Sequence, residues 1–342
     1  MDTVPNNLPL PLSGFIGRED DLDSLQRRLT ASRLVTLTGV GGCGKTRLAL
    51  QTATAMSATF ADGVWLIDLT ALREPTLIPQ LVAYTLGLYQ PPNQPVLASL
   101  LTFLQSKQML LVLDNCEHMT AACAAFLQQL LSHSPSVRVL ATSRESLAIG
   151  GEALYALAGL SWPPLATETV GNQPSNLDPQ ALLHYDAVRL FTERAQAISP
   201  KFAITAENAP AIVAICRRLD GIPLALELAS ARVNVLTVQQ IAARLDDRWA
   251  LLSAGGRAPA APHHHSLRAA IDWSYALLSV AEQTLLQRLS LFSATFTLST
   301  GEAVCAWGAL HRDAVLGLLA TLVAKSMVVA ETLQGSEARY RL

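Results

Sequence analysis

The stretch LVTLTGVGGCGKTRLA, residues 34–49, joins a β-like apolar run to a helical run through a loop that contains four glycines. Residues 39–46 read GVGGCGKT and fit the pattern G-x-x-x-x-G-K-[ST] at every fixed position. Glycines allow positive φ angles and a close approach of the backbone, so that several N–H groups can point at phosphate oxygens. The sequence therefore predicts a polyphosphate-binding loop at the start of a helix.

Each part of this loop has an expected role. We expect Lys45 to neutralise the β and γ phosphates and the Thr46 hydroxyl to bind Mg²⁺. The other expected nucleotide contacts come from Gly39, Gly41, Gly42, Cys43, Gly44 and Arg47. The alternative is an ordinary glycine-rich turn with an exposed lysine, and the position of the motif between a strand and a helix argues against it.

Short apolar runs alternate with helical patterns in the first half of the chain. The expected strands are 34–38, 64–69, 109–114, 137–142 and 153–157, and the expected helices are near 45–58, 75–87, 97–106 and 119–132. Strands of a parallel sheet are buried on both faces and are therefore nearly all apolar. This alternation predicts an α/β P-loop NTPase fold, in which helices cover both faces of a parallel sheet.

Polar residues follow two of these strands. Asp114 ends the run MLLVLD, where a carboxylate can hold the metal of a P-loop site directly or through water. The strand at 137–142 ends in Thr142, with Ser143 and Arg144 directly after it, and these three residues lie beside the phosphates if that strand neighbours the phosphate-loop strand. Arg144 is then a candidate to contact the γ-phosphate, and a solvated loop arginine is the alternative.

Composition limits the remaining possibilities. The chain has 342 residues, a formal net charge of −2 and five cysteines without a C-x-x-C pair, so we expect buried, reduced cysteines rather than disulfides or zinc. It lacks an apolar run long enough to span a bilayer and a basic leader, so we expect a cytoplasmic protein without a membrane partner. His263, His264 and His265 are interpreted as an exposed linker rather than a metal site.

Turn-rich stretches divide the chain. Residues 161–179 are rich in proline and polar turn formers, and residues 253–265 form a second such segment. The expected parts are a nucleotide-binding domain at 1–160, a linker at 161–182, a helical domain at 183–257 and a winged-helix domain at 258–342. Helical patterns at 267–278, 280–291 and 312–324 precede a β-hairpin wing in this last domain.

Seven collinear stretches resemble the STAND class of signal-transduction ATPases, specifically NB-ARC-like bacterial regulators of the AfsR and LuxR type. They are residues 7–19, 37–50, 63–75, 110–118, 137–147, 217–232 and 267–278. The resemblance implies ATP or ADP with Mg²⁺ as cofactors. It also implies that Phe15, Ile16, Gly17 and Arg18 pack around the adenine and that Pro223 closes over it from the helical domain.

The resemblance further implies a switch that self-associates in its ATP state and responds to a trigger through domains absent from this chain. The winged-helix domain is then expected to be truncated at its C-terminus. From residue 266 on, six basic residues balance six acidic ones, and the stretch at 312–326 is apolar nearly all round. A helix that enters a DNA groove carries Arg, Lys, Asn or Gln, so we expect no direct DNA binding by residues 258–342.

The residue after Asp114 bears on turnover. Asn115 stands where fast ATPases carry a carboxylate, and an amide positions water without accepting its proton. Glu117 is either a substitute base or an ordinary loop carboxylate. We therefore expect a slow, Mg-dependent ATPase that works as a signalling switch. The alternatives are a ring-forming AAA-like remodelling ATPase, which needs a strong base and an arginine finger, and a degenerate scaffold that binds no nucleotide.

Overall fold

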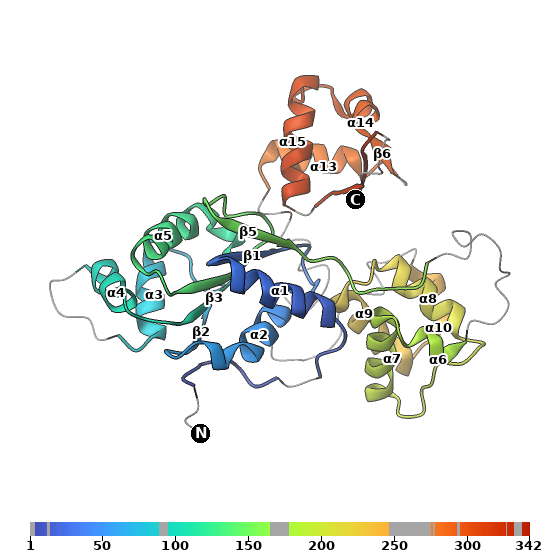
Figure 1. Ribbon diagram of the computed structural model, residues 1–342. Helices are drawn as coiled ribbons and strands as arrows, with labels where there is room; N and C mark the ends of the chain where they lie inside the picture. Colours follow the sequence, from blue (N-terminus) through green and yellow to red (C-terminus); the bar gives the residue numbers. More distant parts are fainter. Residues whose placement is uncertain are drawn as a thin grey trace.

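The computed structural model describes residues 4–11, 14–88, 95–164, 178–245, 275, 278–292, 295–325, 327–331 and 337–342. Its first part is a parallel five-stranded sheet of order β2-β3-β4-β1-β5 (Figure 1). The strands are β1 Leu34–Thr38, β2 Val64–Asp68, β3 Leu110–Asp114, β4 Arg138–Thr142 and β5 Glu152–Ala156. The predicted strands are thus confirmed to within one residue at each end.

This strand order decides which chain segments meet. β4 pairs with β1, with Leu37 opposite Thr142, and with β3 on its other side. The carboxyl ends of β1, β3 and β4 therefore lie side by side at one edge of the sheet. Loops that follow these ends are where open α/β sheets bind ligands.

Helices cover the sheet on both faces. One face packs against α1 Glu19–Ala31 and α2 Lys45–Ala55, and the other against α3 Ile78–Thr85, α4 Val96–Leu104 and α5 Thr120–His133. The sequence pattern did not reveal α1, because its segment EDDLDSLQRRLTA has few apolar positions and buries only Leu25 and Leu29. Each face of the sheet carries a cluster of buried apolar side chains.

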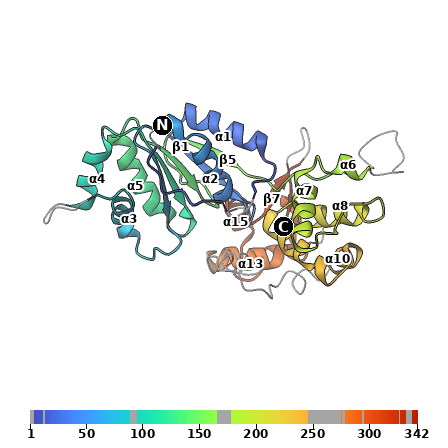
Figure 2. The ribbon, with the colours of Figure 1, turned by 90° about the horizontal axis from the view of Figure 1, so that it is seen from below.

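A helical bundle follows the sheet and lies to one side of it in both views (Figure 1, Figure 2). Its helices are α6 Pro179–Leu182, α7 Asp186–Ile198, α8 Ala209–Arg218, α9 Pro223–Ser230 and α10 Val238–Arg244. Between α8 and α9 the chain turns through Asp220 and Gly221, both with positive φ (50° and 62°). Pro223 then starts α9, a position where its missing N–H costs nothing.

The last part is a winged helix built from α13 Val280–Leu289, α14 Leu298–Cys305 and α15 Arg312–Ala324. Its antiparallel sheet has the order β6-β8-β7, with β6 Phe296–Thr297, β7 Val329–Glu331 and β8 Arg339–Arg341. The predicted hairpin is confirmed as the β7 and β8 pair. α14 and β6 were not predicted, and nearly all of the predicted helix at 267–278, together with His263–His265, lies outside the described residues.

Three expectations about composition can be compared with the structure. All five cysteines are free and buried. Among the residues that the structure describes, no group of three or more His, Cys, Asp or Glu side chains could hold a metal ion. Within that same part of the chain, no helix has the length and hydropathy to cross a membrane.

At Gly159, the chain that follows the sheet lies directly against the backbone of the helical bundle. A Cβ at this position would lie 1.9 Å from the Asp220 carbonyl oxygen, which belongs to the backbone and cannot rotate away. We expect Gly159→Ala to reduce the free energy of unfolding by about 1–3 kcal/mol, as overpacking does, measured by urea denaturation. Gly150→Ala is the matched control, because nothing lies within 4 Å of its added carbon. Equal stability of the two variants would contradict this contact.

Candidate functional site

The phosphate loop combines glycines in the left-handed region with the N-terminus of α2. Gly42 and Gly44 have φ angles of 81° and 96°, which only glycine adopts without strain. Gly44 is the N-cap residue of α2 and offers no side-chain acceptor to the first amides of the helix. These N–H groups and the positive end of the helix dipole form a site for an anion.

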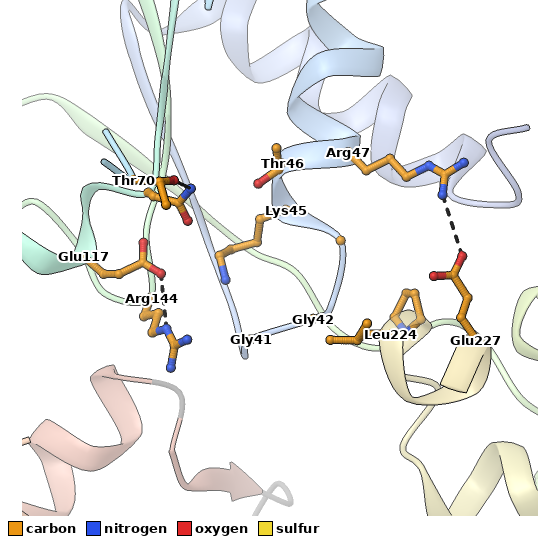
Figure 3. Close-up of a pocket in the computed structure, with 13 residues that line it drawn as sticks. Gly41, Gly42, Lys45, Thr46, Arg47, Thr70, Glu117, Arg144, Leu224 and Glu227 are labelled. Carbon is orange, nitrogen blue, oxygen red and sulfur yellow. Dashed lines mark hydrogen bonds and ion pairs between the residues drawn. The ribbon is translucent and has the colours of Figure 1, made fainter. Parts of the chain in front are cut away.

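A cavity of about 220 Å³ opens in front of this loop (Figure 3). Its walls come from the sheet and from the helical bundle, and they are formed by Gly41, Gly42, Gly44, Lys45, Thr46, Arg47, Thr70, Asn115, Glu117, Arg144, Pro223, Leu224 and Glu227. The structure therefore brings together the predicted residues Gly41, Gly42, Gly44, Lys45, Thr46, Arg47, Asn115, Glu117, Arg144 and Pro223. Gly39 and Cys43 are not among the residues that line this cavity.

Lys45 folds back over its own loop. Its Nζ donates to the carbonyl oxygens of Gly39, at 2.8 Å, and Val40, at 3.2 Å. Backbone carbonyls are neutral acceptors, and an ammonium group forms stronger bonds with phosphate oxygens. Lys45 is thus placed to exchange these carbonyls for a phosphate.

Asp114 is the centre of a cluster of hydroxyl groups. It accepts hydrogen bonds from Thr46 Oγ1 at 2.8 Å and from Thr142 Oγ1 at 2.5 Å, and its side chain is almost fully buried. Burial raises the pKa of Asp114 to about 6, although the hydrogen bonds from Thr142 and Thr46 act in the opposite direction. Among the described residues, no cation pairs with this carboxylate.

These features fit a divalent cation. A buried carboxylate beside a threonine hydroxyl supplies the hard oxygen ligands that Mg²⁺ prefers. Bringing a cation to Asp114 would compensate the burial of its negative charge. The expected pairing of Thr46 with Asp114 at a metal position therefore agrees with the chemistry of the groups.

Asn115 has a structural task in addition to its position in the cavity. It adopts positive φ (63°), and its Nδ2 donates to Thr70 Oγ1 at 2.6 Å and to Asp114 Oδ2 at 3.1 Å. Thr70 was not predicted as a site residue. It follows β2, and only the pairing of β2 with β3 places it beside Asn115.

Glu117 and Arg144 form a buried ion pair at the opposite wall. Arg144 Nε lies 3.2 Å from Glu117 Oε1, and the two side chains are 8% and 5% exposed. Burial lowers the pKa of Arg144, while Glu117 acts against this shift. The second carboxylate oxygen of Glu117 is buried and has no hydrogen-bond partner among the described residues. Arg144 is therefore not a solvated loop arginine.

A second cavity adjoins the first one. Phe15, Ile16, Arg18 and Cys43 line it together with Leu160, Leu190 and Arg194, and it shares Gly44, Arg47, Pro223 and Glu227 with the first cavity. Its apolar side chains surround a small space of about 40 Å³ next to the phosphate loop. The predicted residues Phe15, Ile16 and Arg18 thus meet Pro223 at this cavity, and Gly17 does not line it.

Arg18 and Gly17 contribute to the site indirectly. Arg18 Nη2 donates to the carbonyl oxygens of Cys43 at 2.9 Å and Ala158 at 2.8 Å, which ties the phosphate loop to the chain after β5. Gly17 lies against Asp186 of α7, where a Cβ would come within 2.1 Å of the carboxyl carbon. Both residues therefore hold parts of the protein together.

The helical bundle also rests on the phosphate loop. Leu224 N donates to the Gly42 carbonyl oxygen at 3.3 Å, and a Cβ on Gly42 would lie 2.9 Å from Leu224 Cβ. Arg47 and Arg194 lie 3.9 Å and 2.9 Å from Glu227 of α9. Leu224 and Glu227 were not predicted; they follow Pro223 by one and four residues, so that one face of α9 carries all three.

The raised pKa of Asp114 predicts a pH dependence. Without metal and nucleotide, the folded protein keeps a proton between about pH 4 and pH 6 that the unfolded chain has released. The contribution of Asp114 to stability therefore falls as pH rises through this window, by about 3 kcal/mol in total. We expect the free energy of unfolding of wild type to fall relative to that of Asp114→Asn over this range. Parallel pH profiles of the two proteins would contradict the shift.

Comparisons with known proteins agree with this geometry. Residues 18–151 match the NB-ARC domain, and residues 278–342 match a winged helix-turn-helix domain. Rv0890c of Mycobacterium tuberculosis, named as an HTH-type transcriptional regulator, is 42% identical over 314 residues, which cover 92% of this chain and 33% of that protein. The chain thus spans about a third of the length of this relative.

Two further relatives and one solved structure complete this picture. The uncharacterized protein Rv0894 of Mycobacterium tuberculosis is 39% identical over 97% of this chain and 79% of its own length. The regulatory protein AfsR of Streptomyces griseus is 27% identical over 71% of this chain and 23% of AfsR. The Aeropyrum pernix ORC2 protein, solved as ADPNP and ADP complexes, has the same fold, with a TM-score of 0.50 and 14% identity over 95% of this chain and 89% of that one.

One expectation is wrong. The absence of direct DNA binding by residues 258–342 was inferred from the balanced charge from residue 266 on and from the apolar stretch at 312–326, but a winged helix-turn-helix domain and a relative named as an HTH-type transcriptional regulator point to DNA binding. The physical reason is that net charge does not describe local placement. Many DNA contacts come from a few cations, backbone amides and helix N-termini.

The predicted resemblance is confirmed by the matched domains and by their order along the chain. The cavity in front of the phosphate loop lies within the first matched domain and is closed by the helices that follow it. The chain belongs to the NB-ARC family of STAND P-loop ATPases and carries a winged helix-turn-helix domain after its helical region.

Proposed function

We propose that this chain is the core of a regulator that binds ATP or ADP with Mg²⁺ and uses slow hydrolysis as a switch. The observation that carries this proposal is the shared cavity, because Pro223 and Leu224 of the helical bundle line it together with Lys45 and Thr46 of the phosphate loop. A nucleotide there would contact both parts of the protein. Loss of one phosphate could then change how the parts fit together.

The proposal gives each group a role. The loop amides and Lys45 hold the phosphates, Thr46 and Asp114 hold Mg²⁺, and Arg144 contacts the γ-phosphate. The adenine binds between Phe15, Ile16 and Pro223, with Arg47 at its border, and the second cavity, of about 40 Å³, widens to admit the ring. Mg²⁺, when bound, neutralises charge on the phosphates, and the protein side chains supply the rest of the site.

Slow turnover is supported by the state of the candidate bases. The Asn115 amide cannot accept a proton, and it is held by Thr70 and Asp114. Glu117 is the better candidate for the base. It lines the cavity, and its Oε2 has no hydrogen-bond partner among the described residues. Its other oxygen is engaged by Arg144. Because Glu117 must first separate from Arg144 before it can act as a base, slow hydrolysis is expected, which suits a signalling ATPase better than a remodelling ATPase.

Further parts of this proposal rest on the family. We infer opening and self-association in the ATP state, and a trigger that acts through parts of the longer regulators outside this chain. The division at 1–160, 161–182, 183–257 and 258–342 also stays a prediction. A remodelling ATPase is less consistent with Asn115, and a scaffold without nucleotide is less consistent with the intact phosphate loop.

A second candidate function is DNA binding by the winged helix. Arg312 starts α15 and has a side chain that is 72% exposed, although it contacts Glu302. Arg339 is exposed on β8 of the wing. Phosphates could be contacted from the N-terminus of α15 and from the wing.

Nucleotide binding is tested with two single variants, one at Lys45 in the phosphate loop and one at Lys107 outside the cavity. We expect Lys45→Ala to weaken binding of fluorescent ADP and ATP by at least about 100-fold, because a charge-assisted contact to phosphate is lost. Lys107→Ala is the control, since Lys107 pairs with Asp62 away from the cavity.

We expect wild-type turnover below about 1 per second and a further decrease in Glu117→Gln. Equal nucleotide affinity of wild type and Lys45→Ala would refute the binding site. A turnover rate of wild type well above about 1 per second would refute the slow switch.

DNA binding is tested by anisotropy with a labelled duplex at several salt concentrations. We expect Arg312→Ala and Arg339→Ala each to weaken binding and to reduce the salt slope by about 1, as for the loss of one phosphate contact. Arg27→Ala, on the exposed face of α1, should leave both values unchanged. A wild-type protein that does not bind duplex DNA at low salt would exclude this function.

A further inference from the structure

The side-chain amide of Asn115 enters the nucleotide cavity with its two ends already assigned. Asn115 lines the cavity, and its Nδ2 donates to Thr70 Oγ1 at 2.6 Å and to Asp114 Oδ2 at 3.1 Å. An amide nitrogen carries two hydrogens, so these bonds use both of its donors. Within the described part of the chain, no group donates to the amide oxygen Oδ1, and this atom is not enclosed by the protein. Oδ1 is therefore an acceptor for a molecule in the cavity.

Thr70 decides which end of the amide lies beside it. The Thr70 hydroxyl donates its only hydrogen to Asp68 Oδ1 at 2.5 Å. Its oxygen can therefore only accept from Asn115, so the amide nitrogen and not the amide oxygen must face it. The Thr70 N–H also donates to Asp68 Oδ1, at 2.9 Å, which closes a short turn at the end of β2. Asp68 thus fixes the hydroxyl, and the hydroxyl fixes the amide.

The backbone of Asn115 is held from the strand on the other side. Its N–H donates to Thr142 Oγ1 at 3.0 Å, and Thr142 is the last residue of β4. The φ angle of 63° lies in the left-handed region, which asparagine tolerates better than most residues. Because β3 pairs with both β2 and β4, the residue is held from both neighbours.

Thr70 and Asp114 are different kinds of anchor for this amide. Asp114 and Thr46 are the proposed ligands of Mg²⁺, so a cation there competes with Asn115 Nδ2 for the Asp114 carboxylate. Thr70 and Asp68 have no part in that proposed set of ligands. The bond between Asn115 and Thr70 therefore does not depend on the metal.

We propose that Asn115 Oδ1 accepts a hydrogen bond from the water that attacks the γ-phosphate, and that Thr70, fixed by Asp68, is the positioning residue that keeps this oxygen towards the cavity. The inference rests on the proposed function, in which ATP is hydrolysed in this cavity. A water that donates one O–H to Oδ1 keeps a lone pair for phosphorus. A neutral amide can in this way orient a nucleophile that it cannot deprotonate.

Glu117 completes the step as the base proposed above. A lone pair of the water oxygen forms the new bond to the γ-phosphorus. The bond from that phosphorus to the oxygen shared with the β-phosphate breaks, and its electrons leave with ADP. One proton of the water passes to Glu117, and the proton held by Asn115 stays on the new phosphate oxygen. Both side chains line the same cavity, where the amide orients the water and the carboxylate takes its proton.

The test separates the hydroxyl of Thr70 from the shape of its side chain. Thr70→Val keeps the size and branching and removes the hydroxyl, whereas Thr70→Ser keeps the hydroxyl. Thr85→Val is the matched control, because the Thr85 hydroxyl donates to the Leu81 carbonyl oxygen of its own helix and Thr85 does not line the cavity. The measurements on the full chain are the single-turnover rate of ATP hydrolysis at saturating ATP and Mg²⁺, and the affinity for fluorescent ATP.

We expect Thr70→Val to lower the single-turnover rate about tenfold, because the water is less well oriented, with ATP affinity unchanged within about twofold. Thr70→Ser and Thr85→Val should hydrolyse ATP at the wild-type rate. Asn115→Ala should lower the rate at least as far as Thr70→Val does. The double variant of Thr70→Val with Asn115→Ala should be no slower than Asn115→Ala, because Thr70 acts through Asn115.

Three results overturn the inference. They are a wild-type rate in Thr70→Val, a rate of Thr70→Ser as low as that of Thr70→Val, and effects of Thr70→Val and Asn115→Ala that multiply in the double variant. If Thr70→Val does not fold by circular dichroism, Asp68→Ala is the second variant, because it removes the acceptor of the Thr70 hydroxyl at an exposed position. Its rate, alone and combined with Asn115→Ala, then decides in the same way.

The inference and the proposed function fail in different ways. If wild type and Lys45→Ala bind ATP equally, or wild type does not hydrolyse ATP, the proposed function is wrong, and the inference is wrong with it. If Lys45→Ala loses binding and Glu117→Gln is slow, but Thr70→Val equals wild type, only the inference is wrong.

Discussion

The buried carboxylate of Asp114 is the constraint around which the nucleotide-binding part is built. Hydroxyl groups from α2 and from the end of β4 converge on it through Thr46 and Thr142. Neutral donors only partly offset the cost of burying a charge, and the pKa of Asp114 is accordingly raised. A cation at this position would compensate the buried charge. The strand ends, the phosphate loop and Asn115 are connected through hydrogen bonds to this one carboxylate.

The contacts that surround this carboxylate also connect the parts of the chain. Arg18 ties the phosphate loop to the segment after β5, and Leu224 places the start of α9 on Gly42. On the far wall, the Arg144 and Glu117 pair separates the nucleotide cavity from the winged helix. A small ligand at the phosphate loop therefore borders the nucleotide-binding part and the helical bundle, and the winged helix lies on the far side of the Arg144 and Glu117 pair. This arrangement is suited to a switch, because differential contacts with a ligand are what shift a conformational equilibrium.

Sequence reasoning was strongest where local pattern and chemistry coincide. The glycine-rich loop, the five apolar strands and Asp114 at a strand end were all predictable, because each follows from backbone geometry or from burial on both faces of a sheet. Helix α1 and helix α14 were missed, since α1 has a sparse apolar pattern and α14 is only eight residues long. The DNA-binding prediction failed because it relied on summed charge and on the apolar character of the stretch at 312–326, and neither carries information about the position of individual cations.

The sequence by itself determined the phosphate-binding loop, the alternation of strands and helices, and the residue types that can hold a nucleotide and Mg²⁺. Only the tertiary structure decided the partners of these residues. Thr70 meets Asn115 because β2 pairs with β3, and Glu117 meets Arg144 because β3 pairs with β4. The meeting of Pro223 with the phosphate loop depends on how the helical bundle packs. Strand order and packing between parts depend on contacts between residues that are far apart in the sequence. A single sequence does not show which of these residues lie close together in space.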